Sequence, residues 1–273
     1  MREWNGKPRR VYIRAMPRQT MRQLVGRTRT VRANRQLGLV LAMVAGAVNA
    51  GGYLAVQRYT SHMTGIVSGI ADDLALGDVT LAIAGVLLVG VFVLGAMTTA
   101  VLINWARRRE LNSEYALSLL LEAMLLLLFG VLGTFLATYT TLLVPATVAL
   151  LCFIMGLQNA IVTKISHAEI RTTHMTGIIT DLGIELGKLV YWNGTTSKDD
   201  AYFVRANRDK LVIHGSILAC FTLGGLSGAI AFKFMSYAAT IPIALLLAAL
   251  ALGPVLDDLV AIWQARRSRA AAK

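Results

Sequence analysis

The sequence has few charged residues and almost no cysteine, and each shortage argues against a class of protein. Asp, Glu, Lys and Arg make up 15% of the 273 residues, against roughly 25% in average soluble domains, which argues against an ordinary soluble protein. The two cysteines, Cys152 and Cys220, lie in apolar runs and form no CxxC pair. We therefore expect them to be buried side chains rather than parts of a disulfide framework or a metal site.

The common enzyme signatures are also missing from the sequence. No Walker loop, GxGxxG, HExxH or GxSxG motif occurs in the chain, although each of these would mark a nucleotide, zinc or acyl-transfer site. We predict that the protein is not an enzyme and uses no cofactor and no metal.

Long hydrophobic runs dominate what is present, because 56% of the residues are hydrophobic. Six of the runs are long enough to cross a bilayer as helices, which takes about 20 residues each. The sequence therefore predicts an all-α integral membrane protein with six transmembrane helices. The expected spans are 36–57, 79–105, 115–138, 141–163, 211–233 and 237–263.

The basic residues are placed asymmetrically around these spans. Residues 1–35 hold eleven Lys or Arg and one acid. If the N-terminus is cytoplasmic and the spans alternate, 25 of the 27 Lys and Arg lie inside, and only Arg58 and Lys233 lie outside. Because basic residues accumulate in cytoplasmic loops, we predict that both termini are cytoplasmic. The expected domains are a basic tail (1–35), a membrane domain (36–265) and a basic C-terminus (266–273).

The partner expected for the basic tail is lipid. A basic segment beside a membrane span is attracted to anionic headgroups, whereas this tail lacks the interleaved aromatic residues and binding modules of a nucleic-acid-binding segment. We predict contact with the lipid bilayer and no contact with nucleic acid.

One pentapeptide pattern occurs twice. Residues 61–65 read SHMTG and residues 173–177 read THMTG, while GAVNA at 46–50 aligns with GLQNA at 156–160. The chain therefore divides into two repeats, about 36–138 and about 141–265, each with three spans and a short additional helix that carries the motif. Three spans per repeat force the two repeats into inverted topology, an architecture of secondary transporters.

These segments also carry a family resemblance. The stretches GAVNAGGYLAVQRYTSHMTG and GLQNAIVTKISHAEIRTTHMTG resemble the paired signatures of the YoaK family, bacterial inner-membrane proteins of undefined function. The similarity covers roughly residues 37–262 and implies a multi-pass protein of the bacterial inner membrane. Two positions depart from the family pattern: Asn49 stands where Asp is usual, and Ile66 stands where Asn often follows the first motif.

The duplicated motifs predict a central polar site for a small solute or ion. Ser61 and Thr173 are expected to cap the two motif helices, and the motif glycines should admit a second helix or a ligand. Spacing by eleven residues puts His62 with Asp73, and His174 with Glu185, on shared helix faces. The alternative is that the motifs serve capping and packing and that the acids face water. The expected substrate-binding residues are Asn49, His62, Met63, Thr64, Gly65, Asp73, Gln158, Asn159, His174, Met175, Thr176, Gly177, Asp181 and Glu185.

Other polar residues within the spans occur singly. For Glu122, a proton or cation role and a buried hydrogen bond are both open. We expect His214 to lie at the membrane interface and Asp257 and Asp258 to be solvated. The glycines Gly85, Gly90, Gly95, Gly224 and Gly228 are expected to permit close helix packing.

A permease-like secondary transporter is the function that this pattern favours, with coupling to protons as an option. The alternative is a membrane scaffold or regulator that acts through its lipid-binding tail, and an intramembrane enzyme is disfavoured because no nucleophile–base set is visible. Assembly into an oligomer is compatible with either function.

The charge pattern generates a topology prediction. Single cysteines introduced at Arg108 and Arg205 should both be protected from a membrane-impermeant maleimide in intact cells and react with it once the membrane is permeabilised, because both positions lie in predicted inside loops. Labelling of the two positions from opposite sides would contradict the six-span topology.

Overall fold

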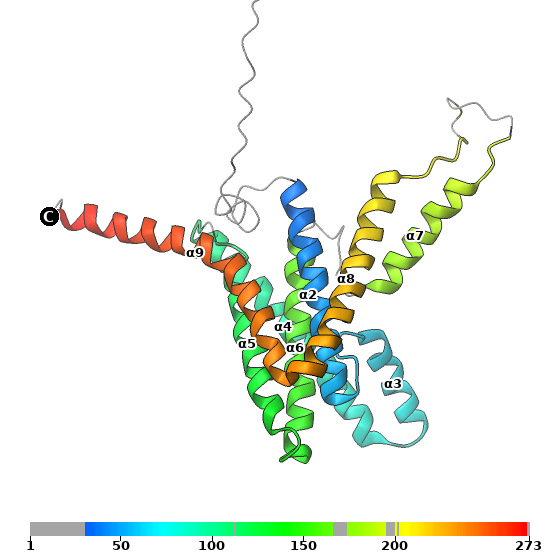
Figure 1. Cartoon of the computed structure of the whole chain (residues 1–273), viewed down its shortest axis with the longest axis horizontal. Coiled ribbons are helices and arrows are strands. Elements are labelled where there is room, and N and C mark those ends of the chain that lie inside the picture. Colours follow the sequence, from blue (N-terminus) through cyan, green and yellow to red (C-terminus); the bar gives the residue numbers. More distant parts are fainter. Residues whose placement is uncertain (1–30, 112, 166–173, 195–199, 201, 272–273) are drawn as a thin grey trace, which may run out of the picture.

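The described part of the chain is built from helices. The computed structural model describes residues 31–111, 113–165, 174–194, 200 and 202–271, and no β-strand occurs among them. Figure 1 shows a bundle of long helices from which α3, α7 and the end of α9 extend. The elements are α2 (Val31–Val56), α3 (Met63–Ala75), α4 (Val79–Arg108), α5 (Ala116–Phe135), α6 (Thr140–Ile165), α7 (Met175–Val190), α8 (Arg208–Met235), η1 (Ser236–Ala239) and α9 (Thr240–Ala271).

The predicted hydrophobic runs coincide with the long helices. Five stretches of the described chain are long and apolar enough to cross a membrane, and the last of them, Arg208–Gln264, has 57 residues. This stretch is not one helix, since α8 ends at Met235 and Ser236 has a φ angle of +51°. The chain reverses there, and α9 runs back along the bundle (Figure 1). The long apolar helices fit a multi-pass membrane protein.

The outer surface of the bundle is apolar in the way that lipid requires. Leu87, Leu94 and Val101 repeat every seven residues on α4 and are each more than half exposed. A contiguous apolar strip of this kind would be unfavourable in water, but it costs nothing against hydrocarbon, where the helical backbone already satisfies its own hydrogen bonds.

Two helix crossings bring backbones into direct contact. At the α2–α8 crossing, a methyl group added at Gly224 would lie 2.0 Å from the carbonyl oxygen of Met43. At the α4–α6 crossing, a methyl group added at Gly95 would lie 2.1 Å from the carbonyl oxygen of Phe153. Only glycine fits at such positions, so the expected packing role is confirmed for Gly95 and Gly224.

Not every glycine in the predicted row packs in this way. Gly228 also meets α2, at the backbone of Ala47, whereas Gly85 meets the side chain of Ile70 on α3. A methyl group added at Gly90 would find no described atom within 4 Å. The prediction for Gly90 is therefore wrong.

The short motif helices rest on the helices that follow them. α3 packs on α4 and α7 packs on α8, and both extend away from the middle of the bundle, α3 toward the bottom and α7 toward the top of Figure 1. The buried core lies between the long helices and includes Leu41, Phe129, Leu151 and Ile217. The motif helices therefore project from a bundle that is held together without them.

The terminal helices extend into both predicted tails. α2 begins at Val31, so the last part of the predicted tail 1–35 is helical, while residues 1–30 lie outside the described residues. α9 continues to Ala271 and contains Pro254, which cannot donate a helical hydrogen bond and bends a helix. Beyond this bend α9 leaves the bundle (Figure 1), and Arg267 lies 4.3 Å from the ring of Trp263.

The backbone contact at Gly224 gives a matched pair of variants. Gly224→Ala should lower stability by about 1–3 kcal/mol, because the new methyl group forces α2 and α8 apart. Gly225→Ala is the control, since its methyl group would lie 3.7 Å from the nearest atom, the carbonyl oxygen of Gly46, and alanine favours helix by up to about 1 kcal/mol. Thermal unfolding of the purified variants in nanodiscs measures both. Equal melting temperatures for the two variants would contradict the close crossing.

Candidate functional site

The histidine, methionine and threonine of both motifs line one cavity, together with Gly177 but without Gly65. The cavity has a volume of about 820 Å³ and is bounded by the starts of α3 and α7 together with parts of α4, α6 and α8. Its volume falls in the range of small-molecule sites. The lining residues are Ser61, His62, Met63, Thr64, Phe92, Asn159, Thr163, His174, Met175, Thr176, Gly177, Ile178, Thr180, Asp181 and His214.

The histidine of each motif stands immediately before its helix. His62 and His174 are the N-cap residues of α3 and α7, and neither makes a side-chain capping hydrogen bond. The prediction that Ser61 caps α3 is wrong, because its hydroxyl donates a 2.7 Å hydrogen bond to Oδ1 of Asn49 on α2. Thr173, the other predicted cap, lies outside the described residues.

The glycine of each motif accommodates the histidine ring. A methyl group added at Gly65 would lie 2.3 Å from Cδ2 of His62, and one added at Gly177 would lie 2.4 Å from Cδ2 of His174. The nearest neighbour of each glycine is therefore its own histidine and not the second helix that we predicted. The glycine three residues after each histidine thus leaves the space that the imidazole ring occupies. Gly177 also lines the cavity, and the approach of a ligand to it stays a prediction.

The two predicted amides of α6 have different surroundings. Asn159 lines the cavity, and its Nδ2 donates to the carbonyl oxygen of Met155 at 2.9 Å. Gln158 is fully buried away from the cavity, and its Nε2 donates to the carbonyl oxygen of Leu41 on α2 at 3.4 Å. Oε1 of Gln158 has no hydrogen-bond partner among the described residues. Gln158 thus links α6 to α2, whereas Asn159 faces the site.

The predicted pairs of histidine and carboxylate do not form. Neither Asp73 nor Glu185 lines the cavity. The predicted shared faces assume that His62 and His174 are part of their helices. Both residues instead precede the helix with non-helical backbone angles, so their side chains do not follow the helical spacing. Asp181, in contrast, is on the cavity.

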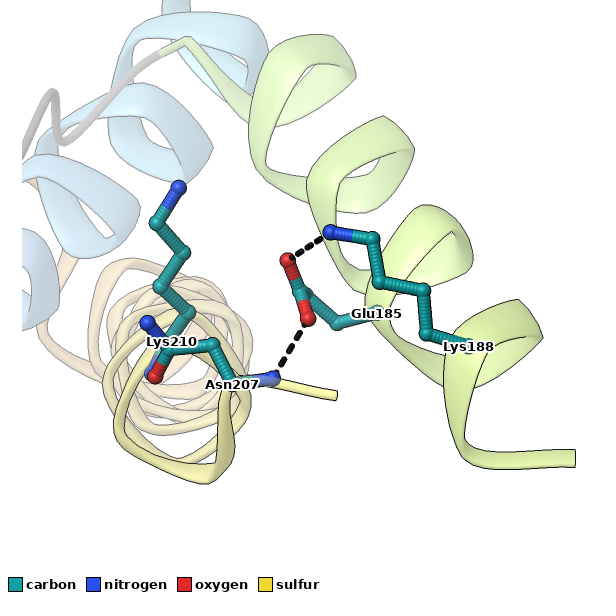
Figure 2. Close-up of polar contacts among 4 residues, drawn as sticks. All are labelled: Glu185, Lys188, Asn207 and Lys210. Carbon is teal, nitrogen blue, oxygen red and sulfur yellow. Dashed lines mark hydrogen bonds and ion pairs between the residues drawn. The ribbon is translucent and has the colours of Figure 1, made fainter. Parts of the chain in front are cut away.

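Glu185 instead joins α7 to α8. Its carboxylate accepts a 2.7 Å hydrogen bond from the backbone N–H of Asn207 and a 2.9 Å bond from Nζ of Lys188. Figure 2 shows the carboxylate between these two donors, with Lys210 nearby. The N–H of Asn207 and then the ammonium of Lys188 lower the pKa of Glu185, since both stabilise its charged form.

Two polar residues of the spans are buried, which contradicts the solvated state predicted for Asp258. His214 of α8 is only 8% exposed and lines the cavity, while its place at the membrane interface stays a prediction. Asp258 is also buried and accepts a 2.9 Å hydrogen bond from the N–H of Ser113. His214 is not part of the repeated pattern, since the corresponding position of the first half, on α4, is Gly85. The repeat therefore gives no signal for it. Only the packing of α8 beside α7 reveals it.

Glu122, the acidic residue of α5, is fully buried. It has no exposed surface, and neither carboxylate oxygen has a hydrogen-bond partner among the described residues. The buried hydrogen bond considered for it is therefore not formed within the described chain, and Glu122 does not line the cavity.

Comparisons with known proteins give one match. A family model described as "Protein of unknown function (DUF1275)" matches residues 37–253, which include both motifs and every described residue that lines the cavity. No curated protein and no solved structure matches. Among the described residues, no group of three or more His, Cys, Asp or Glu could hold a metal ion.

The contact between Glu185 and Asn207 predicts a pH-dependent loss of stability. Because its pKa is lowered in the folded protein, Glu185 stabilises the fold above its unfolded pKa of about 4.3, and this contribution disappears as the pH falls through the lowered folded value. Glu185→Gln should therefore melt at a lower temperature than the parent at pH 7, and the difference should shrink as the pH falls below the unfolded pKa and through the lowered folded value. Asp73→Asn is the control, with no such difference expected. A difference for Glu185→Gln that is independent of pH would contradict the charge-dependent contact.

Proposed function

The chain belongs to the DUF1275 family of proteins of unknown function, and we propose from its cavity that it is a permease-like transporter of a small solute or ion. The observation that carries the proposal is that two helix starts of the same sequence, 112 residues apart, open into one cavity. Secondary transporters commonly bind their solutes where interrupted helices of two repeats meet.

The helix crossings support an internal repeat. Gly46 of α2 meets the carbonyl oxygen of Phe221 on α8, and Gly156 of α6 meets the carbonyl oxygen of Phe92 on α4. The two glycines are 110 residues apart and the two phenylalanines are 129 apart. Gly95 and Gly224 are also 129 apart, so both crossings are built from corresponding residues of the two halves.

The six-span topology accounts for the inversion of these halves. A 57-residue apolar stretch is much longer than the roughly 20 residues that one crossing needs, and the break at Ser236 divides it into two helices. With six spans, α2 and α6 cross in opposite directions. The two motifs would then approach the cavity from opposite sides of the membrane, and the basic residues would collect on the cytoplasmic side, as they do in bacterial inner-membrane proteins.

Two motif helices that reach one cavity from opposite sides of the membrane suit an alternating-access mechanism. In such a mechanism the site stays near the middle of the membrane while one repeat rocks against the other. The cavity contains hydroxyl, amide, imidazole and carboxylate groups, which suits a polar solute. Its carboxylate, Asp181, and its histidines are groups that can exchange protons, so coupling to a proton gradient belongs to the proposal.

Reconstitution tests this function with two carboxylates. Proteoliposomes should be screened against carboxylates, amino acids, sugars and inorganic ions, with and without a pH gradient, by solid-supported-membrane electrophysiology and tracer uptake. For a solute that moves, Asp181→Asn should lower the flux about tenfold or more, the cost of losing a hydrogen bond to a charged group. Asp73→Asn, which lies off the cavity, should retain the parental flux.

Three outcomes would contradict the proposal or its site. No flux above protein-free liposomes for any solute would contradict the transport function. Equal losses in both variants would remove the cavity from the mechanism. A cellular function that is lost on deletion of residues 1–30, in a protein that moves no solute, would favour the scaffold alternative.

A further inference from the structure

The two helix starts on the cavity, those of α3 and α7, carry no acidic residue in their first turns and are not capped by their N-cap histidines. The first backbone N–H groups of a helix have no partner within the helix, and together they carry roughly half a positive charge. Two such ends therefore face one cavity.

The next helices in each half show that the missing cap is specific to the cavity. Asp78 caps α4 by accepting the N–H of Leu81 at 3.1 Å, and Asn207 caps α8 by accepting the N–H of Lys210 at 3.1 Å. Asp78 and Asn207 are 129 residues apart, as are the glycines of the two crossings. Each half thus caps the helix that begins away from the cavity and leaves uncapped the helix that begins on it.

His214 provides an independent observation. It comes from α8 rather than from a motif, it lines the same cavity, and more than nine-tenths of it is buried. Its Nδ1 has no hydrogen-bond partner among the described residues. A buried polar atom without a partner is costly, and a ligand that bonds to it in the cavity removes that cost.

The placement of charge around the cavity leaves the helix starts free of any carboxylate. No lysine or arginine is among its described lining residues, and Asp181 is the one carboxylate there. Asp181 is seven residues along α7 from His174, which is about 10 Å at 1.5 Å per residue. Its negative charge is therefore about two helical turns away from the helix start, while the positive helix ends lie at the motifs.

We propose that this cavity binds a small oxyanion, a carboxylate or a phosphate group, between the starts of α3 and α7 and beside His214. The inference rests on the proposed transport function in that it names the substrate class of the same site. Backbone N–H groups at helix starts bind such anions without any lysine or arginine. Asp181, further along α7, is placed to accept a hydrogen bond from the other end of the solute.

Charge placed at one helix start tests the proposal. Purified protein in phosphatidylcholine nanodiscs should bind ¹⁴C-acetate or ³²P-phosphate in equilibrium dialysis, and should not bind ¹⁴C-tetramethylammonium. Met175→Glu adds a negative charge in the first turn of α7 and should weaken anion binding about tenfold, because the new carboxylate takes the place of the ligand. Met175→Gln has nearly the same shape without the charge. The difference in affinity between the Glu and Gln variants therefore measures the effect of the charge alone.

The first half of the chain supplies a second, independent pair. Met63→Glu and Met63→Gln should repeat the difference at α3, so the proposal stays testable if one Met175 variant does not fold. Melting temperatures of all four variants identify any that are unfolded. Repeating the dialysis in discs with phosphatidylglycerol separates two sources of the anion: competition by this lipid assigns the site to a headgroup, and unchanged affinity assigns it to a soluble anion.

The outcomes separate this inference from the transport function. Failure of the parent protein to bind either anion at millimolar concentration, or equal losses in the Glu and Gln variants, would overturn the anion site. Flux of a cation or an uncharged solute without anion binding would overturn the anion site and leave the transporter. Anion binding without any flux would leave the anion site and overturn the transporter.

Discussion

The close approach of backbones at two helix crossings is the constraint on which the rest of the structure depends. Gly224 lets α8 reach the backbone of α2, and Gly95 lets α4 reach the backbone of α6. Because α3 packs on α4 and α7 packs on α8, the distance between the two crossings also sets the distance between the two motif helices. A side chain at either glycine would displace a long helix together with the motif helix that it carries. The cavity is therefore a consequence of packing between helices that contribute few of its lining side chains.

The two halves share a scaffold but do not contribute equally to the cavity. The histidine, methionine and threonine of both motifs lie on it. Asp181 and His214 come only from the second half, since the corresponding positions of the first half are Gly69 and Gly85. A symmetric site would offer the same groups to both ends of a solute. The unequal groups therefore favour a solute with two chemically different ends, one bound at the helix starts and the other beside Asp181.

The helices and the pairing of the motifs follow from the sequence, but the partners of individual polar side chains do not. Hydrophobic length alone locates the long helices, because any segment that crosses a bilayer must satisfy its own backbone hydrogen bonds. Duplication alone suggests that the two motifs meet. Glu185, however, bonds to a backbone group 22 residues away across the α7–α8 connection, and neither periodicity nor repeat alignment can supply that contact. His214 is on the cavity because of where α8 packs, and the helical-wheel argument for the motif histidines failed because both stand just outside their helices.

The two motif helices are not held with equal strength, and this difference bears on how the cavity could open. Each rests on a single long helix and exposes large apolar side chains, such as Val67 and Leu74 on α3 and Ile184 and Leu189 on α7. Elements with few buried contacts open at the lowest free energy. The far end of α7 is tied to the start of α8 by Glu185, whereas the carboxylate of Asp73, the corresponding residue of α3, makes no such bond within the described chain. The tie at Glu185 therefore joins α7 to the helix that carries His214, so that these two sides of the cavity are linked by a polar contact as well as by packing.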